Sequence, residues 1–382
     1  MRNFKEHYER SKVDEIRYIM EAVSDSLRKE VLDLVKKVES DQDLIRVKNT
    51  LMAKAISEEI EKFRQKSFLD DKEVSYIEKL IVASNASVES KFELIALLKG
   101  KSSKLSSKDF GKTFTKSLNS LTPKKFLNNQ CWKSITQDIL NYSQQSANGV
   151  GKAELYFMLI GKNGSKPSSR GKGAKGDVVI DGFHIEMKAG GVMHTGHRDG
   201  VKMGITIEIH AELIEWGKKN GYDMSNANPI YGSFHQVSGA KQNWLWMFFD
   251  SLPKKDYDRL MKKYLSKVYG KAFSAATITA LANKLRPILG DKEKVPALFA
   301  PYVYMAYKKH EKFNSLMVVD LRSNVCYNMV DKKIPSGLKF KGPQMARGKS
   351  TYAVPEGGIS FGFDRSLKEE NDFEGDNTLL DF

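Results

Sequence analysis

Two short runs of alternating apolar and polar residues meet at an Asp-Gly pair near the middle of the chain. The runs are Asp177–Ile180 and Phe183–Lys188, and Asp181-Gly182 lies between them. An Asp-Gly pair between such runs predicts a two-residue hairpin turn, because both residues tolerate the positive φ angles that this turn needs. Since neighbouring residues of a strand point to opposite faces, a hairpin also fixes which side chains lie together. The segment therefore predicts a strand pair whose faces can be assigned residue by residue.

The same alternation gathers charged side chains on one face. In the second strand Ile185 and Met187 share one face, and Glu186 and Lys188 lie on the other. Asp177 opens the first strand, and the hairpin can bring it to the side of Glu186. Two carboxylates held close repel each other unless a cation neutralises them, and Mg²⁺ commonly takes one or two carboxylates with phosphate oxygens and water. A neighbouring lysine can orient or deprotonate an attacking water, so the pattern indicates metal-assisted hydrolysis of a phosphodiester.

The positive charge of the chain is concentrated just before this hairpin. The 382 residues carry 62 Lys and Arg against 47 Asp and Glu, for a formal net charge of +15. Residues 101–175 hold 14 basic and 3 acidic side chains, whereas residues 1–100 hold 19 basic and 20 acidic ones. A clustered excess of cations favours a polyanionic partner, and contacts between lysine and phosphate are salt-sensitive and independent of base sequence.

A glycine- and serine-rich loop carries part of this excess between the apolar run Ala153–Ile160 and the hairpin. It lacks the G-x-x-x-x-G-K-[ST] order of a P-loop, so nucleotide hydrolysis is not expected. A loop that faces nucleic acid fits better, with a cluster of cations that can pair with phosphates. The candidate phosphate contacts are Lys162, Lys166, Arg170, Lys172 and Lys175.

A second group of candidates follows the hairpin in the sequence GGVMHTGHRDG. His194, His197 and Arg198 can contact phosphate or substrate there, and an ordinary polar loop is the alternative. A zinc site would need four convergent ligands, commonly Cys with His, and neither Cys131 nor Cys326 is near in sequence. We therefore expect no zinc at these histidines.

Together, these residues resemble the PD-(D/E)xK nuclease superfamily, which includes restriction endonucleases, Holliday-junction resolvases and phage nucleases. The resemblance rests on Asp177, on Glu186-Met187-Lys188 in the predicted hairpin, and on Glu154 in the preceding helix. The order GKAE, glycine-rich basic loop, GDVVIDG and IEMKAGG is also similar to nuclease-like proteins of large tailed phages. One departure is that Gly176, rather than proline, precedes Asp177.

The resemblance implies an α/β fold class: a restriction-endonuclease-like mixed β-sheet core flanked by helices, here with an N-terminal all-helical extension. It implies Asp177 and Glu186 as metal ligands, Lys188 as the catalytic lysine and Glu154 as a supporting helical acid. The implied cofactor is Mg²⁺, with Mn²⁺ as the alternative. The implied activity is that of a metal-dependent DNA endonuclease on double-stranded DNA. Two alternatives stay open: a catalytically silent DNA-binding or phage assembly protein of the same fold, and an RNA-directed or junction-resolving nuclease.

The sequence divides into four regions. Residues 1–100 contain no proline, and their apolar residues recur at three- and four-residue steps, which predicts a helical bundle or extension. Residues 101–149 read as a basic linker and helix, and any helix there would align Lys104, Lys108, Lys112 and Lys116 as a cationic stripe. Residues 150–366 form the predicted nuclease core with added helices and strands. Residues 367–382 are a disordered acidic tail that either binds a protein partner, covers the cationic groove, or only aids solubility.

Other patterns predict the elements after the hairpin. Residues 254–311 contain helical stretches, Leu316–Leu321 reads as a buried strand, and Val325–Val330 is its candidate neighbour, in the same sheet or in a separate small domain. His235–Phe249 predicts an aromatic-rich helix, whose rings belong to a core more often than to a base-stacking surface. His210 lies in the strand-like sequence ITIEIHAEL.

The chain shows no apolar run long enough to span a bilayer and no apolar core of a secretory signal at its start, and it has only two cysteines. These features exclude a disulfide scaffold and predict a protein without membrane association in a reducing compartment. We expect a cytoplasmic location in a bacterium or a phage-infected host cell.

Overall fold

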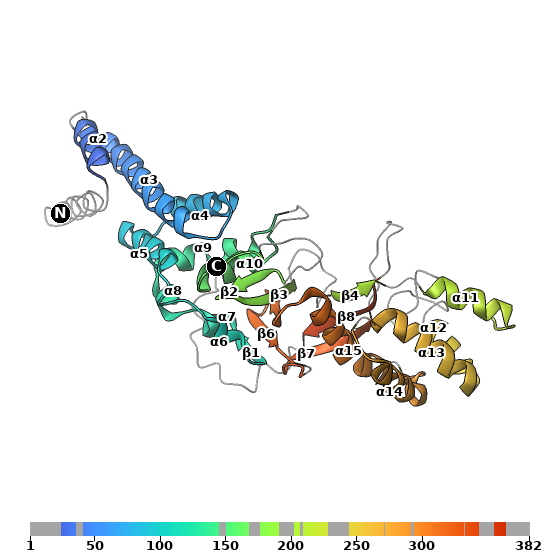
Figure 1. Ribbon diagram of the computed structural model, residues 1–382. Coiled ribbons are helices and arrows are strands. Elements are labelled where there is room, and N and C mark those ends of the chain that lie inside the picture. The colour runs from blue at the N-terminus through green and yellow to red at the C-terminus, as the bar shows by residue number, and fades with distance from the viewer. Residues whose placement is uncertain are drawn as a thin grey trace. The chain divides into compact units, whose positions relative to one another are not determined.

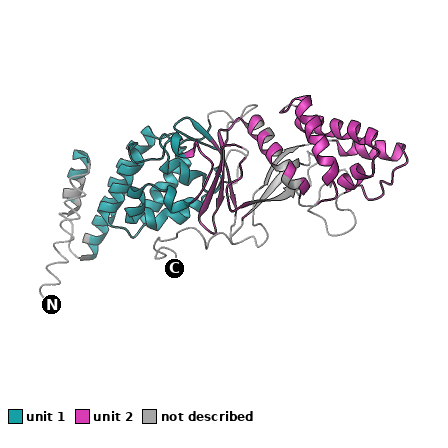
Figure 2. Cartoon of the chain, turned by 90° about the horizontal axis from the view of Figure 1, so that it is seen from below, with its two compact units in different colours: residues 1–109, 117–170, 177–184 teal, residues 110–116, 171–176, 185–382 magenta. Residues whose placement is uncertain are grey.

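The computed structural model describes residues 24–35, 41–144, 150–167, 176–190, 202–206, 209–227, 244–270, 272–291, 294–331, 333–343 and 355–363. The chain forms two compact units, which do not follow chain order (Figure 2). Unit 1 comprises residues 1–109, 117–170 and 177–184, and unit 2 comprises residues 110–116, 171–176 and 185–382. The predicted basic linker, residues 101–149, therefore contributes to both units.

The N-terminal part of unit 1 is helical, as the apolar periodicity predicts (Figure 1). Leu51, Ala55 and Ile60 of this pattern are buried in its core. Side chains at the helix starts accept backbone N–H groups; Ser87, for example, accepts from the N–H of Ser90. The helices of this part are α2 (Asp25–Val35), α3 (Asp41–Lys66), α4 (Asp71–Ala83) and α5 (Val88–Lys99).

The segment after α5 does not form one continuous helix. It folds as the short helix α6 (Ser107–Phe110), the strand β1 (Phe114–Ser117), and the helices α7 (Leu118–Leu121), α8 (Lys124–Asn128) and α9 (Gln130–Asn141). The four-residue spacing of its lysines therefore produces no cationic stripe. Asn328 holds the turn before β1, because its amide donates to the carbonyl oxygens of Phe110 and Lys112.

A five-stranded mixed sheet has the order β1-β6-β5-β3-β2. Its remaining strands are β2 (Val178–Ile180), β3 (Phe183–Gly190), β5 (Ser315–Asp320) and β6 (Val325–Met329). β3 runs parallel to β5, with Ile185 opposite Ser315, and β5 runs antiparallel to β6, with Leu316 opposite Met329. Every residue of β5 and β6 is buried, as expected for strands covered on both faces. The two predicted strands near residues 316 and 325 thus join the sheet that contains the hairpin, which the sequence left undecided. The division into units passes through β3.

Unit 2 also contains a second sheet and a helical cluster. The sheet has the order β4-β8-β7, from β4 (Lys202–Thr206), β8 (Pro355–Phe363) and β7 (Leu338–Pro343), and α15 (Lys294–Glu311) contacts all three strands. The helical cluster consists of α11 (His210–Lys219), α12 (Trp244–Ser251), α13 (Lys254–Tyr269), α14 (Ala275–Leu285) and the 3₁₀ helix η2 (Arg286–Ile288).

Two sequence predictions are resolved in this helical cluster. The aromatic residues of α12 are buried, so the core interpretation is confirmed for Trp244, Trp246 and Phe249. The interpretation of His210 as a strand residue is wrong, because it begins α11. Ile209 and Leu213, one helical turn apart, are both buried, and this helical spacing outweighs the alternation that precedes it. Among the described residues, no helix combines the length and the apolarity needed to cross a membrane.

Candidate active site

The Asp-Gly turn connects β2 to β3 as predicted. Asp181 and Gly182 have φ angles of 49° and 78°, the left-handed values that a two-residue turn with Asp-Gly requires. In β3 the side chains of Ile185 and Met187 are buried, in agreement with the face assigned to them. Strand and turn chemistry alone therefore account for the hairpin.

Glu186 and Lys188 form an ion pair on β3. The Lys188 Nζ lies 2.5 Å from the Glu186 Oε1 and also donates to the carbonyl oxygen of Met187 at 3.0 Å. The side chain of Glu186 is only 6% exposed, and that of Lys188 is 27% exposed. A buried carboxylate is costly unless it is paired, and the ion pair with Lys188 offsets part of that cost.

Gly176 shapes the backbone just before β2, where Asp177 lies. Its φ is +75°, and a Cβ at this position would lie 2.7 Å from the carbonyl oxygen of Ile185 and 3.0 Å from the backbone nitrogen of Glu186. Only glycine meets both demands without strain, and proline, whose φ is fixed near −65°, cannot adopt this conformation. Proline therefore does not fit at position 176, and Asp177 follows directly as a half-buried residue.

Glu154 is the first residue of α10 (Glu154–Ile160), where the sequence predicts a helix. The residue before it, Ala153, is fully buried and has a φ of 65°. This left-handed conformation costs a non-glycine residue about 1–2 kcal/mol, and such strained residues often lie at functional sites. A Cβ on Gly151 would lie 2.3 Å from the Glu154 Oε1, so this glycine provides the space for the carboxylate.

The structure describes two of the candidate phosphate contacts in the basic loop. Lys162 donates to Asp181 at 3.4 Å, and its side chain is 39% exposed. Lys166 pairs with Glu73 at 2.5 Å and with Asp70 at 2.7 Å, and it is only 12% exposed. A phosphate would have to compete with these carboxylates for Lys166. The other candidates, Arg170, Lys172, Lys175, His194, His197 and Arg198, lie outside the described residues.

Sequence reasoning missed the cluster around Glu73. This carboxylate is fully buried at the start of α4, where Oε2 accepts the N–H of Asp70 and Oε1 accepts from Gln144 and Lys166. Burial lowers the pKa of Lys166, but the hydrogen bonds that Lys166 donates to Asp70 and Glu73 outweigh it, so the net shift in pKa is upward. The sequence signal was the capping box Asp70–Glu73, which marks a helix start but does not name a partner 93 residues away.

The donor set fits a hard divalent cation. Asp177 and Glu186 offer carboxylate oxygens, the ligands that Mg²⁺ and Mn²⁺ prefer, and Mg²⁺ needs only one or two of them with water and phosphate. Within the described ranges, no group of three or more His, Cys, Asp or Glu side chains is placed to hold a metal ion. The carboxylates that the sequence predicted as ligands, Asp177 and Glu186, therefore stay a prediction, and the ion pair between Glu186 and Lys188 is the part of the candidate site that the structure describes.

No protein-family model matches this chain, and neither does any curated protein or solved structure.

Proposed function

We propose that this protein is a metal-dependent nuclease that cuts DNA phosphodiester bonds. The observation that carries the proposal is the ion pair between Glu186 and Lys188 on β3, directly after the Asp-Gly hairpin that Asp177 opens. A buried acid and a lysine two residues apart on one strand face are the arrangement that the Glu-x-Lys pattern requires.

In this proposal Asp177 and Glu186 hold Mg²⁺ or Mn²⁺. When bound, such an ion supplies charge stabilisation for the phosphate and lowers the pKa of a bound water. Lys188, which lies beside Glu186, would orient the attacking water or offset phosphate charge. Glu154, at the start of α10, supports a second cation or a water.

The choice of DNA rests on charge. The excess of basic residues at 101–175 leads directly to Asp177, and a polyanion is attracted to that part of the chain. Two alternatives are outcomes of the same experiment: a silent DNA-binding or phage assembly protein of this fold, and a nuclease for RNA or for DNA junctions. The acidic tail at residues 367–382, a proposed partner-binding segment, lies outside the described residues.

The test is a cleavage assay with supercoiled, linear, single-stranded and four-way-junction DNA and with RNA, each with Mg²⁺, Mn²⁺ or EDTA. Asp177→Asn and Lys188→Arg preserve size and, for the arginine, charge; each should lower cleavage by about 10²–10⁴-fold while DNA binding survives. Lys218→Ala is the matched control, because it removes an exposed lysine of α11. Salt-sensitive DNA binding without metal-dependent products would reject the enzyme and favour the silent protein. If both site variants cleave DNA as fast as the natural protein does, the assignment of Asp177 and Lys188 to the site is rejected.

A further inference from the structure

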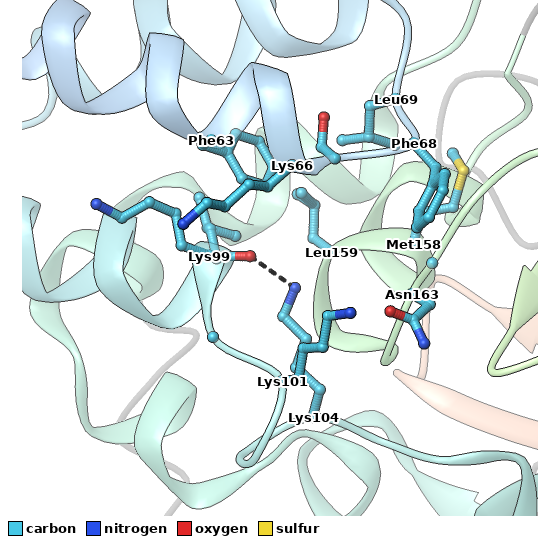
Figure 3. Close-up of a pocket in the computed structure, with 14 residues that line it drawn as sticks. Phe63, Lys66, Phe68, Leu69, Lys99, Lys101, Lys104, Met158, Leu159 and Asn163 are labelled. Carbon is cyan, nitrogen blue, oxygen red and sulfur yellow. Dashed lines mark hydrogen bonds between the residues drawn. The ribbon is translucent and has the colours of Figure 1, made fainter.

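A small pocket in unit 1 lies where three helices end (Figure 3). Lys66 ends α3, Lys99 ends α5, and Met158 and Leu159 belong to the last turn of α10. The cavity has a volume of about 40 Å³. A single water needs roughly 10–15 Å³ on this measure, so the space suits about three waters or one tetrahedral anion such as phosphate.

The charged lining of this pocket is entirely cationic. It contains Lys66, Lys99, Lys101 and Lys104, and no acidic residue. Lys99 is neutralised by an ion pair with Glu59. For the other three lysines, no ion pair with a carboxylate occurs within the part of the chain that the structure describes. Three lysines therefore line the pocket without a carboxylate partner among the described residues.

The helix ends offset only part of this charge. A helix C-terminus carries about half a negative elementary charge, so three of them bring about −1.5. The three lysines without a carboxylate partner contribute +3, so a net charge of more than +1 remains at the pocket. The positive charge of the lysines thus exceeds the partial negative charge of the helix ends, and a bound anion would neutralise the excess.

Lys104 lies deepest in this arrangement. Its Nζ donates to the carbonyl oxygen of Leu98 at 2.8 Å, which leaves further N–H groups for a ligand. Burial, with a smaller effect of the neighbouring Lys101, lowers the pKa of Lys104 to about 8. Burying this ammonium costs free energy, and a charge-assisted hydrogen bond to a phosphate oxygen would offset that cost.

Phe68 provides an aromatic surface at the same pocket. It is 62% exposed, which is unusual for a residue that normally belongs to a core. Its backbone pairs with Ser165, which in turn pairs with Val179, so the ring is carried by an anchored segment. Figure 3 shows the ring together with Asn163 and the lysines among the lining residues. An exposed ring beside uncompensated cations suits a ligand that has both a flat ring and a phosphate.

We propose that this pocket binds a phosphate monoester whose attached base stacks on Phe68. The shared chemistry is that of a nucleoside monophosphate and of the 5′-phosphorylated end of a nucleic-acid strand. The lysines hold the terminal phosphate, and the ring holds the base. This site consists only of unit 1 residues and does not depend on the proposed cleavage at β3.

The test measures dissociation constants of the full chain in EDTA, so that binding is scored without cleavage. The probes are inorganic phosphate, adenosine, adenosine monophosphate, and a short single-stranded DNA with and without a 5′ phosphate. Lys104→Met and Lys101→Met each remove one ammonium and keep an unbranched side chain of similar length. Because Lys101 is exposed, we expect at least the Lys101→Met variant to fold normally. Lys108→Met removes an exposed lysine outside the pocket and is the matched control. Phe68→Leu removes the ring.

We expect the phosphorylated probes to bind at least tenfold more tightly than their unphosphorylated forms. Both pocket lysine variants should lose about tenfold in affinity, Lys108→Met should lose none, and Phe68→Leu should abolish the advantage of the nucleotide over inorganic phosphate. Tighter binding of the mononucleotide assigns the site to free nucleotides, and tighter binding of the strand assigns it to strand ends. Equal affinity with and without the phosphate, or unchanged affinity in both lysine variants, would overturn the proposal.

A pH series gives an independent readout. The titratable groups at the pocket other than Lys104 are Lys66 from α3, Lys99 with its partner Glu59, and Lys101. Burial lowers the pKa of Lys104 to about 8. A phosphate monoester is fully ionised above about pH 7. Affinity should therefore fall several-fold between pH 7 and pH 9, and Lys104→Met should remove this dependence; a pH dependence that persists in that variant contradicts the assignment.

Discussion

Removing Lys188 should destabilise the protein more than removing the charge of Glu186. The Glu186 side chain is 6% exposed and that of Lys188 is 27% exposed. Water therefore compensates an unpaired charge on Lys188 better than one on Glu186. Lys188→Met leaves a carboxylate buried without its cation, which costs about 3–5 kcal/mol. Glu186→Gln leaves an ammonium that still reaches water, so we expect a cost of about 1 kcal/mol. The double variant removes both charges and should be more stable than Lys188→Met alone.

Urea unfolding followed by tryptophan fluorescence measures this cycle. Three of the four tryptophans belong to unit 2, which also contains Glu186 and Lys188. The three variants and the natural protein are compared at pH 7. Additive free energies in the double variant, or a Lys188→Met cost no larger than that of Glu186→Gln at pH 7, would refute the reasoning.

Three further predictions concern the surroundings of the site, each checked by the free energy of unfolding. Lys166→Met leaves the buried Glu73 without its cation and should cost about 2–3 kcal/mol. Because the folded-state pKa of Lys166 is raised, this contribution should be complete below about pH 10 and fade as pH rises further; a constant cost up to pH 12 would contradict it. Gly176→Ala should cost at least 1 kcal/mol more than Gly182→Ala, because both positions have positive φ but only Gly176 faces backbone atoms within 3 Å; equal costs would contradict the steric argument. Ala153→Gly should stabilise by about 0.5–1 kcal/mol by relieving a left-handed φ, and a loss of stability would show that the strain is absent.

The parts of the fold that the sequence predicted depend on interactions within a few residues. The Asp-Gly turn, the alternation in β3, and the helix that begins at Glu154 were all readable from turn chemistry and periodicity. The interpretation of His210 as a strand residue failed where two local patterns compete, because His210 followed a strand pattern yet begins α11. The lysines spaced four apart share no single helix, because Lys108 lies in α6 and Lys116 lies in strand β1.

By itself, the sequence determined the hairpin and the helical N-terminal part, because turn preferences and periodicity act over short distances. Only the tertiary structure decided that Glu186 is buried with Lys188 as its partner, that Lys166 is held by a carboxylate 93 residues away, and that three helix ends meet at one cationic pocket. Burial and long-range pairing depend on which elements pack together, and that packing is a property of the whole chain rather than of any segment. The physical consequences that matter for function, namely desolvation and uncompensated charge, arise from it.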